Sequence, residues 1–311
     1  MTDALNRISR WDETTLRKPI GYLSPRDIEI LQLLDPERRF HYLPSNWIAH
    51  FVGGDWYTIT NRLGQLASAP NNYLTRPSAQ QCAPNSNFKH QVYTLADKGA
   101  TYLVESGRRQ FLPGRVNETF FHKLISDVVD ASIEIGCSAP HRRLDWRDII
   151  ALKIVPEATL AAKAPLRIPV GDDVVIPDGR PIAITHANQE RFILGKEIDR
   201  DTEDLSGNSK NSIAKKLLRY KRIFSDGIYR SHFGFKNSVV LYVATHTRGN
   251  QGRRLQKVMH LAKEVIGAPT WLLFKEMEDL QFVNRYPEPN GDMLANDWQR
   301  VGHEPLNLGA F

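Results

Sequence analysis

Cysteine is scarce in this sequence: the 311 residues include only two, Cys82 and Cys137, and they form no Cys-x-x-Cys pair. Two distant cysteines cannot build the disulfide framework of a small secreted domain or a cysteine-based zinc site. Apolar runs are also short, and none approaches the roughly 20 residues of a membrane-spanning helix. Residues 1–18 are polar and charged and contain no signal-peptide core. We therefore expect a cytoplasmic protein without a membrane partner.

The bulk composition fits a folded protein with a mildly basic surface. Hydrophobic residues make up 41% and charged residues 24% of the chain, which argues against extensive disorder. The length allows two domains with a core each. The formal net charge is +6 and the isoelectric point is about 9.2. Such a charge suits a polyanionic partner such as nucleic acid.

The first structured region is expected at residues 21–106, after a flexible arm at residues 1–20. Ser24 is a good helix N-cap and Pro25 suits the first helical position, so the first helix begins there. Apolar spacing and turn residues predict the other elements: helices at 44–51, 57–66 and 96–105, and hairpin strands at 73–75 and 90–95. Three helices, a hairpin and a closing helix predict a winged helix-turn-helix domain.

A helix that reads DNA presents polar side chains on the face away from the core. In the predicted third helix these are Tyr57, Thr58, Thr60, Asn61, Arg62 and Gln65. Asn, Gln and Arg pair with base edges, whereas Thr and Tyr usually hold phosphates. The loop between the hairpin strands would be the wing, with Arg76 and Lys89 as its basic residues. The domain is predicted to bind double-stranded DNA without a cofactor; the alternative is a winged helix that binds another protein.

A linker at residues 107–118 separates this domain from a second one at residues 119–275. Its predicted elements are helices at 120–135, 209–224 and 252–266, and strands at 181–185, 192–198, 238–244 and 270–274. The continuous apolar run at 238–244 is typical of a buried strand, and alternating strands and helices indicate a mixed sheet of the α/β (α+β) class. Residues 276–311 contain Pro, Asn and Gly and are predicted to form an irregular tail.

Three carboxylates mark a candidate site in the second domain: Asp178 before one strand, and Glu197 and Asp199 at the end of the next. Alternation along a strand places Glu197 and Asp199 on one side, and strand pairing would bring Asp178 near Glu197. Converging carboxylates are what Mg²⁺ or Mn²⁺ requires, and such an ion can activate water against a phosphodiester. Asp178 and Glu197 are the predicted metal ligands. The alternative is that all three are solvated charges at strand ends.

The helix predicted at 209–224 is basic and supplies two further candidates. Lys216 and Tyr220 are four residues apart and therefore share a face. A lysine there can reach a phosphate, and a tyrosine can orient one. The alternative is an ordinary solvated charged face.

Taken together, these residues resemble the replication-relaxation family, bacterial proteins linked to plasmid replication and mobilisation. The resemblance covers most of the chain, with marks at 23–27, 62–66, 92–99, 177–179, 197–202 and 216–220. It implies a winged helix followed by a nuclease-like domain, in a cytoplasmic protein associated with a plasmid or the nucleoid. A relaxase, a replication protein or a recombination protein would be its protein partner.

The second domain also resembles the PD-(D/E)xK nuclease fold. In that fold an Asp and a Glu on adjacent strands bind metal, and a Lys two residues after the Glu assists catalysis. Asp178 and Glu197 match the acidic positions, but the lysine position holds Asp199. Lys196 should point away, so a migrated Lys215 or Lys216 would have to act from the following helix. Lys216 and Tyr220 also resemble a Gln-x-x-x-Tyr helix of some such nucleases, with Lys in place of Gln.

Two hypotheses follow from the sequence. The first is a sequence-selective DNA-binding regulator or accessory factor of plasmid replication, transfer or transcription, with a nuclease-like domain that does not cleave. The second is a metal-dependent DNA endonuclease that uses Asp178, Glu197 and Asp199. Operators are often palindromic because their reader is a dimer, so a homodimer is expected.

Overall fold

The computed structural model describes residues 17–36, 38–82, 89–109, 120–138, 145–148, 167–186, 189–205, 212–247 and 249–310. The chain forms a mixed α/β structure that divides into two compact units. Unit 1 comprises residues 1–131 and 280–289, and unit 2 comprises residues 132–279 and 290–311. The division falls within helix α5 (Phe120–Ser138), whereas the sequence placed it in a linker before that helix.

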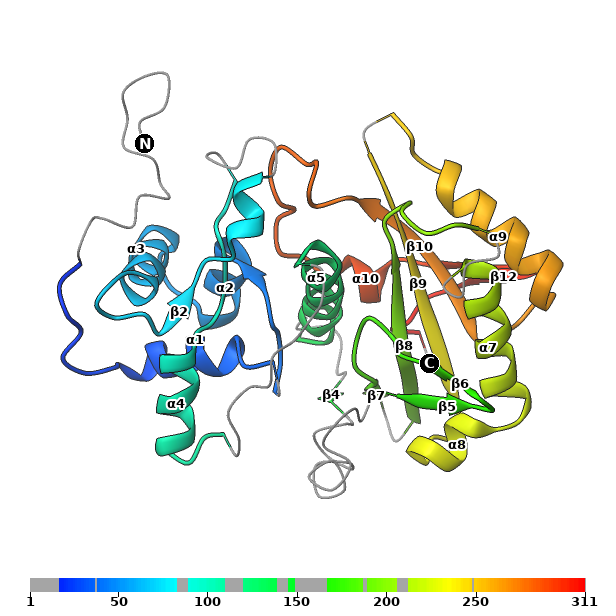
Figure 1. Ribbon diagram of the computed structural model, residues 1–311, viewed down its shortest axis with the longest axis horizontal. Coiled ribbons are helices and arrows are strands. Elements are labelled where there is room, and N and C mark those ends of the chain that lie inside the picture. The colour runs from blue at the N-terminus through cyan, green and yellow to red at the C-terminus, as the bar shows by residue number, and fades with distance from the viewer. Residues whose placement is uncertain are drawn as a thin grey trace. The chain divides into compact units, whose positions relative to one another are not determined.

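Unit 1 contains the elements expected for residues 21–106 and two more, strand β1 and a 3₁₀ helix. In chain order they are α1 (Pro25–Leu33), β1 (Leu43–Pro44), α2 (Ser45–Val52), α3 (Trp56–Ala67), β2 (Leu74–Thr75), a 3₁₀ helix (Ser78–Cys82), β3 (Val92–Leu95) and α4 (Asp97–Glu105) (Figure 1). The predicted hairpin is present, because β2 and β3 pair antiparallel with Leu74 opposite Leu95. Strand β1, which pairs with β3 on its other side, was not predicted.

Local sequence explains where the helices of unit 1 begin. Ser24 and Asp27 form a reciprocal capping box at the start of α1, with Pro25 in the first turn. Asp55 caps α3 by accepting from the Thr58 backbone N–H at 2.7 Å. Ile59 and Leu63 are fully buried, because residues four apart lie on one face of a helix and this face is apolar.

A segment from the far end of the chain completes unit 1. Residues 280–289 belong to it, and the backbone oxygen of Pro287 accepts from Asn46 Nδ2 at 3.1 Å and from Trp47 Nε1 at 2.9 Å. Leu280 and Tyr286 of this segment are buried. These bonds satisfy buried donors of α2, so the segment is part of the core structure of unit 1.

Unit 2 is built on a seven-stranded mixed sheet in the order β12-β11-β10-β9-β8-β7-β4. The strands are β4 (Asp145–Asp148), β7 (Ile182–His186), β8 (Gln189–Asp199), β9 (Ser238–His246), β10 (Leu272–Glu278), β11 (Trp298–Arg300) and β12 (His303–Leu306). Only the pairs β8–β9 and β9–β10 are parallel. A separate hairpin joins β5 (Ile168–Val170) and β6 (Asp173–Val175).

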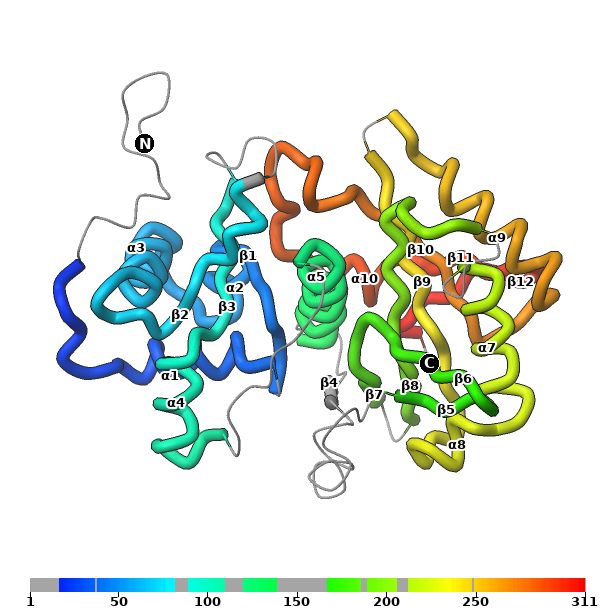
Figure 2. The backbone as a smooth tube through the Cα atoms, in the orientation of Figure 1, coloured from blue at the N-terminus to red at the C-terminus, as the bar shows by residue number. Residues whose placement is uncertain are grey.

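Helices α7 (Ile213–Ser225) and α9 (Arg253–Ile266) cover one face of this sheet, and α8 (Ile228–Phe233) and α10 (Asp292–Ala295) are short (Figures 1 and 2). Leu217 of α7 and Val258 of α9 join Tyr242 and Phe274 of the sheet in one hydrophobic core. The alternating strands and helices of the prediction are therefore present. The prediction for residues 276–311 was wrong, because α10, β11 and β12 lie there and Trp298 is fully buried.

Candidate functional site

The outer face of α3 carries a row of polar side chains. Tyr57 is 69% exposed, and Thr58 and Asn61 are exposed as well. Thr58 and Asn61 are three residues apart and Tyr57 and Asn61 are four apart, so the three share one side of the helix. The Thr58 hydroxyl donates to the capping Asp55 at 2.9 Å. In the described part of the chain the Asn61 amide has no hydrogen-bond partner, so it is available to a ligand.

Arg62 and Gln65 are not placed as the sequence predicted. The Arg62 guanidinium makes a two-pronged bond to the buried Asp27 carboxylate, at 2.8 and 2.6 Å, and its third nitrogen donates to Gln65 Oε1 at 2.6 Å. Burial raises the pKa of Asp27, but hydrogen bonds from Arg62 and Ser24 outweigh it and leave the pKa below its usual value. Arg62 therefore ties α3 to α1, and the expectation that it faces outward was wrong.

Three more predicted DNA contacts are buried or half-buried: Thr60, Lys89 and Arg76. Thr60 is half-buried, and its hydroxyl oxygen is enclosed with no hydrogen-bond partner. Lys89 was expected on an exposed wing but is 3% exposed; its ammonium donates to the backbone oxygen of Gln281 at 2.9 Å. It also lies 5.6 Å from the centre of the Tyr286 ring. Arg76 is half-buried, and the expected wing tip at 83–88 lies outside the described residues.

Arg26 is an interface candidate that the sequence patterns did not single out. It is exposed on the first turn of α1, and its guanidinium lies against Gly54, where an added Cβ would be 3.3 Å from Nη1. Gly54 has φ +102° and immediately precedes the N-cap of α3. This arginine therefore stands at the N-terminal end of the exposed α3 face. The sequence alone does not show that Arg26 and Asn61 belong to one surface, because they are far apart in the chain. The packing of α1 beside the turn before α3 brings them together.

In unit 2, an irregularity in β8 decides which carboxylates face the helices. The register with β9 shifts between Ile193 and Gly195, so Gly195 lies opposite Val240 and Glu197 opposite Tyr242. Such a bulge reverses the alternation of the following residues. Phe192 precedes the bulge and Leu194 is its extra residue; both lie in the core that faces α7 and α9, and Glu197 follows on the same face. Lys196 therefore points to the other face, as expected, and is fully buried there.

Asp178 is hydrogen-bonded to β8 by both its backbone and its side chain. Its N–H donates to the Lys196 oxygen at 2.8 Å, and its Oδ2 accepts from the Ile198 N–H at 2.7 Å. Gly195 permits this approach, because an added Cβ would lie 2.4 Å from the Pro177 Cβ. The predicted proximity of Asp178 and Glu197 is thus present, and part of the Asp178 carboxylate is already used to satisfy the backbone of β8.

Glu197 is paired with the two side chains that the sequence singled out on α7. Tyr220 donates from its hydroxyl to Glu197 Oε1, and the Lys216 ammonium lies 2.8 Å from Oε2. Lys216 also lies 3.2 Å from Glu203. The Lys216–Glu197 contact is therefore a close ion pair on a buried carboxylate. A migrated lysine therefore does reach the acidic position, as one sequence hypothesis required.

Burial controls the protonation of this cluster. The pKa of Glu197 is raised to about 7, mainly by burial and to a smaller extent by the Asp178 charge, although Lys216 and Tyr220 act in the opposite direction. Burial lowers the pKa of Lys216, but the carboxylates of Glu197, Asp178 and Glu203 outweigh it and hold that pKa above its usual value. The lysine therefore remains a cation throughout the physiological range and supplies the positive charge inside the cluster.

Asp199 does not join Glu197, although it lies on the same face. Its carboxylate accepts from the Tyr242 hydroxyl at 2.8 Å and from two nitrogens of Arg254, at 2.7 and 3.1 Å. Arg254 in turn donates to the backbone oxygen of Glu203. Neither partner was predicted from the sequence, and the prediction that Asp199 converges with Asp178 and Glu197 was wrong. Asp199 instead anchors α9 to the end of β8.

In this arrangement protein groups already occupy the carboxylate oxygens that a divalent metal ion would need. Glu197 Oε1 accepts a hydrogen bond from Tyr220, and Oε2 forms an ion pair with Lys216. Asp178 Oδ2 accepts a hydrogen bond from the Ile198 backbone N–H. Among the described residues, no group of three or more His, Cys, Asp and Glu side chains is arranged to hold a metal. A metal ion prefers several oxygen ligands in one shell, whereas this cluster surrounds an ammonium with carboxylates. The cluster is therefore built around the Lys216 ammonium.

Comparison of the chain with protein-family models, curated proteins and solved structures finds no match. The relation to the replication-relaxation family and to PD-(D/E)xK nucleases therefore stays a prediction from the sequence. Within the described residues, no helix has the length and apolar character to span a bilayer.

Proposed function

We propose that the protein is a sequence-selective double-stranded DNA-binding protein in which unit 1 is the winged-helix reader. Its elements follow the order α1-β1-α2-α3-β2-β3-α4, with α2 and α3 as the helix-turn-helix and β2–β3 as the wing hairpin. A helix-turn-helix places its second helix in the major groove, with its N-terminal residues at the base edges. In this assignment α3 is the recognition helix.

The observation that carries the proposal is the exposed side of α3. Its first turns present Tyr57, Thr58 and Asn61, while Ile59 and Leu63 are buried behind them. A free amide such as that of Asn61 can pair with adenine N6 and N7. Arg26 stands beside the start of this face, where an exposed guanidinium can hold a phosphate. Asn61 can therefore contact a base edge while Arg26, beside the start of the same face, contacts the DNA backbone.

In this proposal unit 2 does not cleave DNA. Its central carboxylate is neutralised by Lys216 and hydrogen-bonded by Tyr220, and the third predicted catalytic carboxylate, Asp199, is held by Arg254. The role in regulating plasmid replication, transfer or transcription rests on the sequence resemblance alone, as do partners among relaxases, replication proteins and recombination proteins. A homodimer is proposed because operators are often palindromic and read by dimers.

Duplex binding can be tested with DNA of random sequence. A randomised duplex library is selected with the full chain, and affinity for the enriched sequence is measured by fluorescence anisotropy against salt. Asn61→Ala should weaken specific binding by about 1–3 kcal/mol and relax sequence preference at one position. Arg26→Ala should weaken all duplexes alike and reduce the salt slope by about 0.9.

Arg38→Ala is the matched control, because Arg38 is an exposed arginine beyond the opposite end of α1. It should leave both affinity and salt slope unchanged. Absence of salt-sensitive duplex binding by the full chain would refute the proposal. Binding that Asn61→Ala leaves intact would refute the assignment of α3 as the reader.

The metal-dependent endonuclease remains the second candidate, because Lys216 does reach Glu197 next to Asp178. Incubation of supercoiled plasmid with Mg²⁺ or Mn²⁺ separates the two functions. We expect no nicking above that of the Glu197→Gln variant. Nicking that disappears in Glu197→Gln would establish the endonuclease instead.

A further inference from the structure

Unit 2 contains a cavity of about 1080 Å³ at the end of the sheet opposite to Glu197. It lies where β8 and β9 begin and just before β10, between Gln189, Ser238 and Trp271. Ligand pockets typically span roughly 300–1000 Å³. The space therefore suffices for a ligand the size of a nucleotide or somewhat larger. Neither predicted function uses this cavity.

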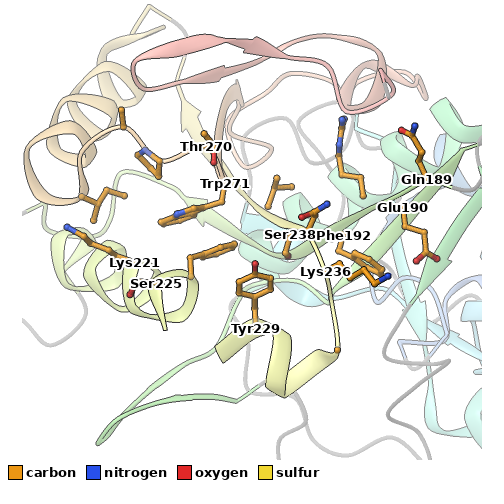
Figure 3. A pocket seen from close by; sticks show the side chains of 18 residues that line it. Gln189, Glu190, Phe192, Lys221, Ser225, Tyr229, Lys236, Ser238, Thr270 and Trp271 are labelled. Atoms are coloured by element: carbon orange, nitrogen blue, oxygen red, sulfur yellow. The ribbon is translucent and has the colours of Figure 1, made fainter. Parts of the chain in front are cut away.

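One wall of the cavity is aromatic. The rings of Phe224 and Trp271 stack with centroids 4.3 Å apart and an interplanar angle of 3°, and Tyr229 lies 4.9 Å from Phe224. Figure 3 shows Trp271 and Tyr229 on one side of the space, with Phe192 and Ser238 on the other. Trp271 and Phe224 are only half-buried, so this aromatic wall can pack against a flat ligand.

Positive charge borders the same space. Lys221 of α7 and Lys236 before β9 both line the cavity, and both are exposed. In the described parts of the chain neither ammonium has an ion-pair or hydrogen-bond partner. Arg191 also lines the cavity, but its guanidinium already donates to the backbone oxygens of Asn307, Leu308 and Ala310. Glu190 is the single acidic residue among the described lining residues.

We propose that this cavity binds a nucleotide unit, with the base against Trp271 and the phosphate between Lys221 and Lys236. Aromatic side chains combined with lysines are the combination by which proteins hold single-stranded nucleic acid, because every base has a flat face and every link a charge. The same chemistry would serve a free mononucleotide. This site lies in unit 2 and is independent of the duplex reader proposed for unit 1.

The test uses the full chain and two probes, a fluorescein-labelled thymidine octanucleotide and unlabelled ribonucleoside monophosphates. Anisotropy measures the first and calorimetry the second. Trp271→Leu should weaken binding by about 10- to 100-fold, which corresponds to the loss of one stacked base. Lys221→Ala combined with Lys236→Ala should reduce the single-strand salt slope by about 1.4, since each phosphate contact contributes about 0.7.

Lys257→Ala combined with Lys263→Ala removes the same charge from the exposed side of α9, away from the cavity lining, and should change nothing. Binding of the octanucleotide alone would identify a strand as the ligand, and comparable binding of a monophosphate would identify a free nucleotide. Should Trp271→Leu fail to fold, Lys221→Glu combined with Lys236→Glu provides the test from exposed positions.

Two results would overturn the proposal: no binding of either probe at millimolar concentration, or binding that neither the tryptophan nor the lysine variants weaken. Failure here is distinguishable from failure of the duplex reader. Asn61→Ala should leave octanucleotide binding unchanged, and the cavity variants should leave binding to the selected duplex unchanged.

Discussion

Replacing Lys216 by Met should destabilise unit 2 in a strongly pH-dependent manner. The ammonium lies 2.8 Å from Glu197 Oε2 and is the cation among Glu197, Asp178 and Glu203. Removing one partner of a buried ion pair typically costs about 3–5 kcal/mol, because the remaining charge is left uncompensated. Met keeps the apolar stem of the side chain, so the loss reports the charge.

The pH dependence follows from the direction of the Glu197 shift. Its pKa rises from 4.5 to about 7 on folding, so the folded state holds the proton more tightly than the unfolded state. The stability that Glu197 contributes through this proton is fully present below pH 4.5 and is lost as the pH rises through 7. The pKa difference of about 2.5 units corresponds to about 3 kcal/mol of folding free energy. Without Lys216 the pKa should rise further, so stability should continue to fall above pH 7.

Native-state hydrogen exchange, measured on peptides from β8, gives the free energy of the local unfolding that exposes Glu197. At pH 8.5 we expect Lys216→Met to lose about 3 kcal/mol or more relative to wild type, and at pH 5.5 about 1 kcal/mol or less, because Glu197 is then protonated. Adding Glu197→Gln should restore most of the loss and remove its pH dependence.

Lys221→Met is the matched control, since it removes a lysine charge from the exposed side of the same helix. It should have little effect at either pH. An equal loss for Lys216→Met at pH 5.5 and 8.5 would contradict the assignment of a raised Glu197 pKa. A loss below about 1 kcal/mol at pH 8.5 would show that the ion pair contributes little.

Two further predictions concern packing in unit 1. Gly99→Ala should lower the melting temperature and cost about 1–3 kcal/mol of folding free energy, because the added Cβ would lie 2.3 Å from the Tyr73 backbone oxygen. Gly64→Ala on α3 should instead stabilise the fold by up to about 1 kcal/mol, because no atom lies within 4 Å of the added Cβ. Equal shifts in thermal melts would contradict this. Lys89→Met should speed hydrogen exchange across residues 280–289 by about tenfold through loss of the bond to Gln281, and unchanged exchange would show that the bond is dispensable.

Features encoded by neighbouring residues were predictable from the sequence. The Ser24–Asp27 capping box and the buried Ile59 and Leu63 of α3 follow from spacings of three and four residues. The same reasoning placed Lys216 and Tyr220 on one face of α7, and both indeed contact Glu197. Periodicity carries this information because it depends only on the geometry of a single element.

Features created by distant partners were not predictable in this way. The sequence predicts that Arg62 faces outward as a recognition residue, but in the structure it binds Asp27, which lies 35 positions earlier. From the sequence Lys89 is expected at the surface, but its ammonium is buried and donates a hydrogen bond to the backbone oxygen of Gln281, 192 positions later. Asp199 shares a face with Glu197, but only the fold shows that Arg254 holds it. Each error concerns a charged side chain whose buried partner lies on another element.

The return of residues 280–289 to unit 1 has a consequence for synthesis of the chain. Ribosomes release the N-terminal residues first, and domains generally fold as they emerge. Unit 1 cannot follow that order to completion, because Asn46 and Trp47 find their acceptor at Pro287 only after residues 132–279 of unit 2 have been made. The proposed DNA reader would therefore gain its final form only after that part of unit 2 has been synthesised, and a product truncated before residue 280 would lack it.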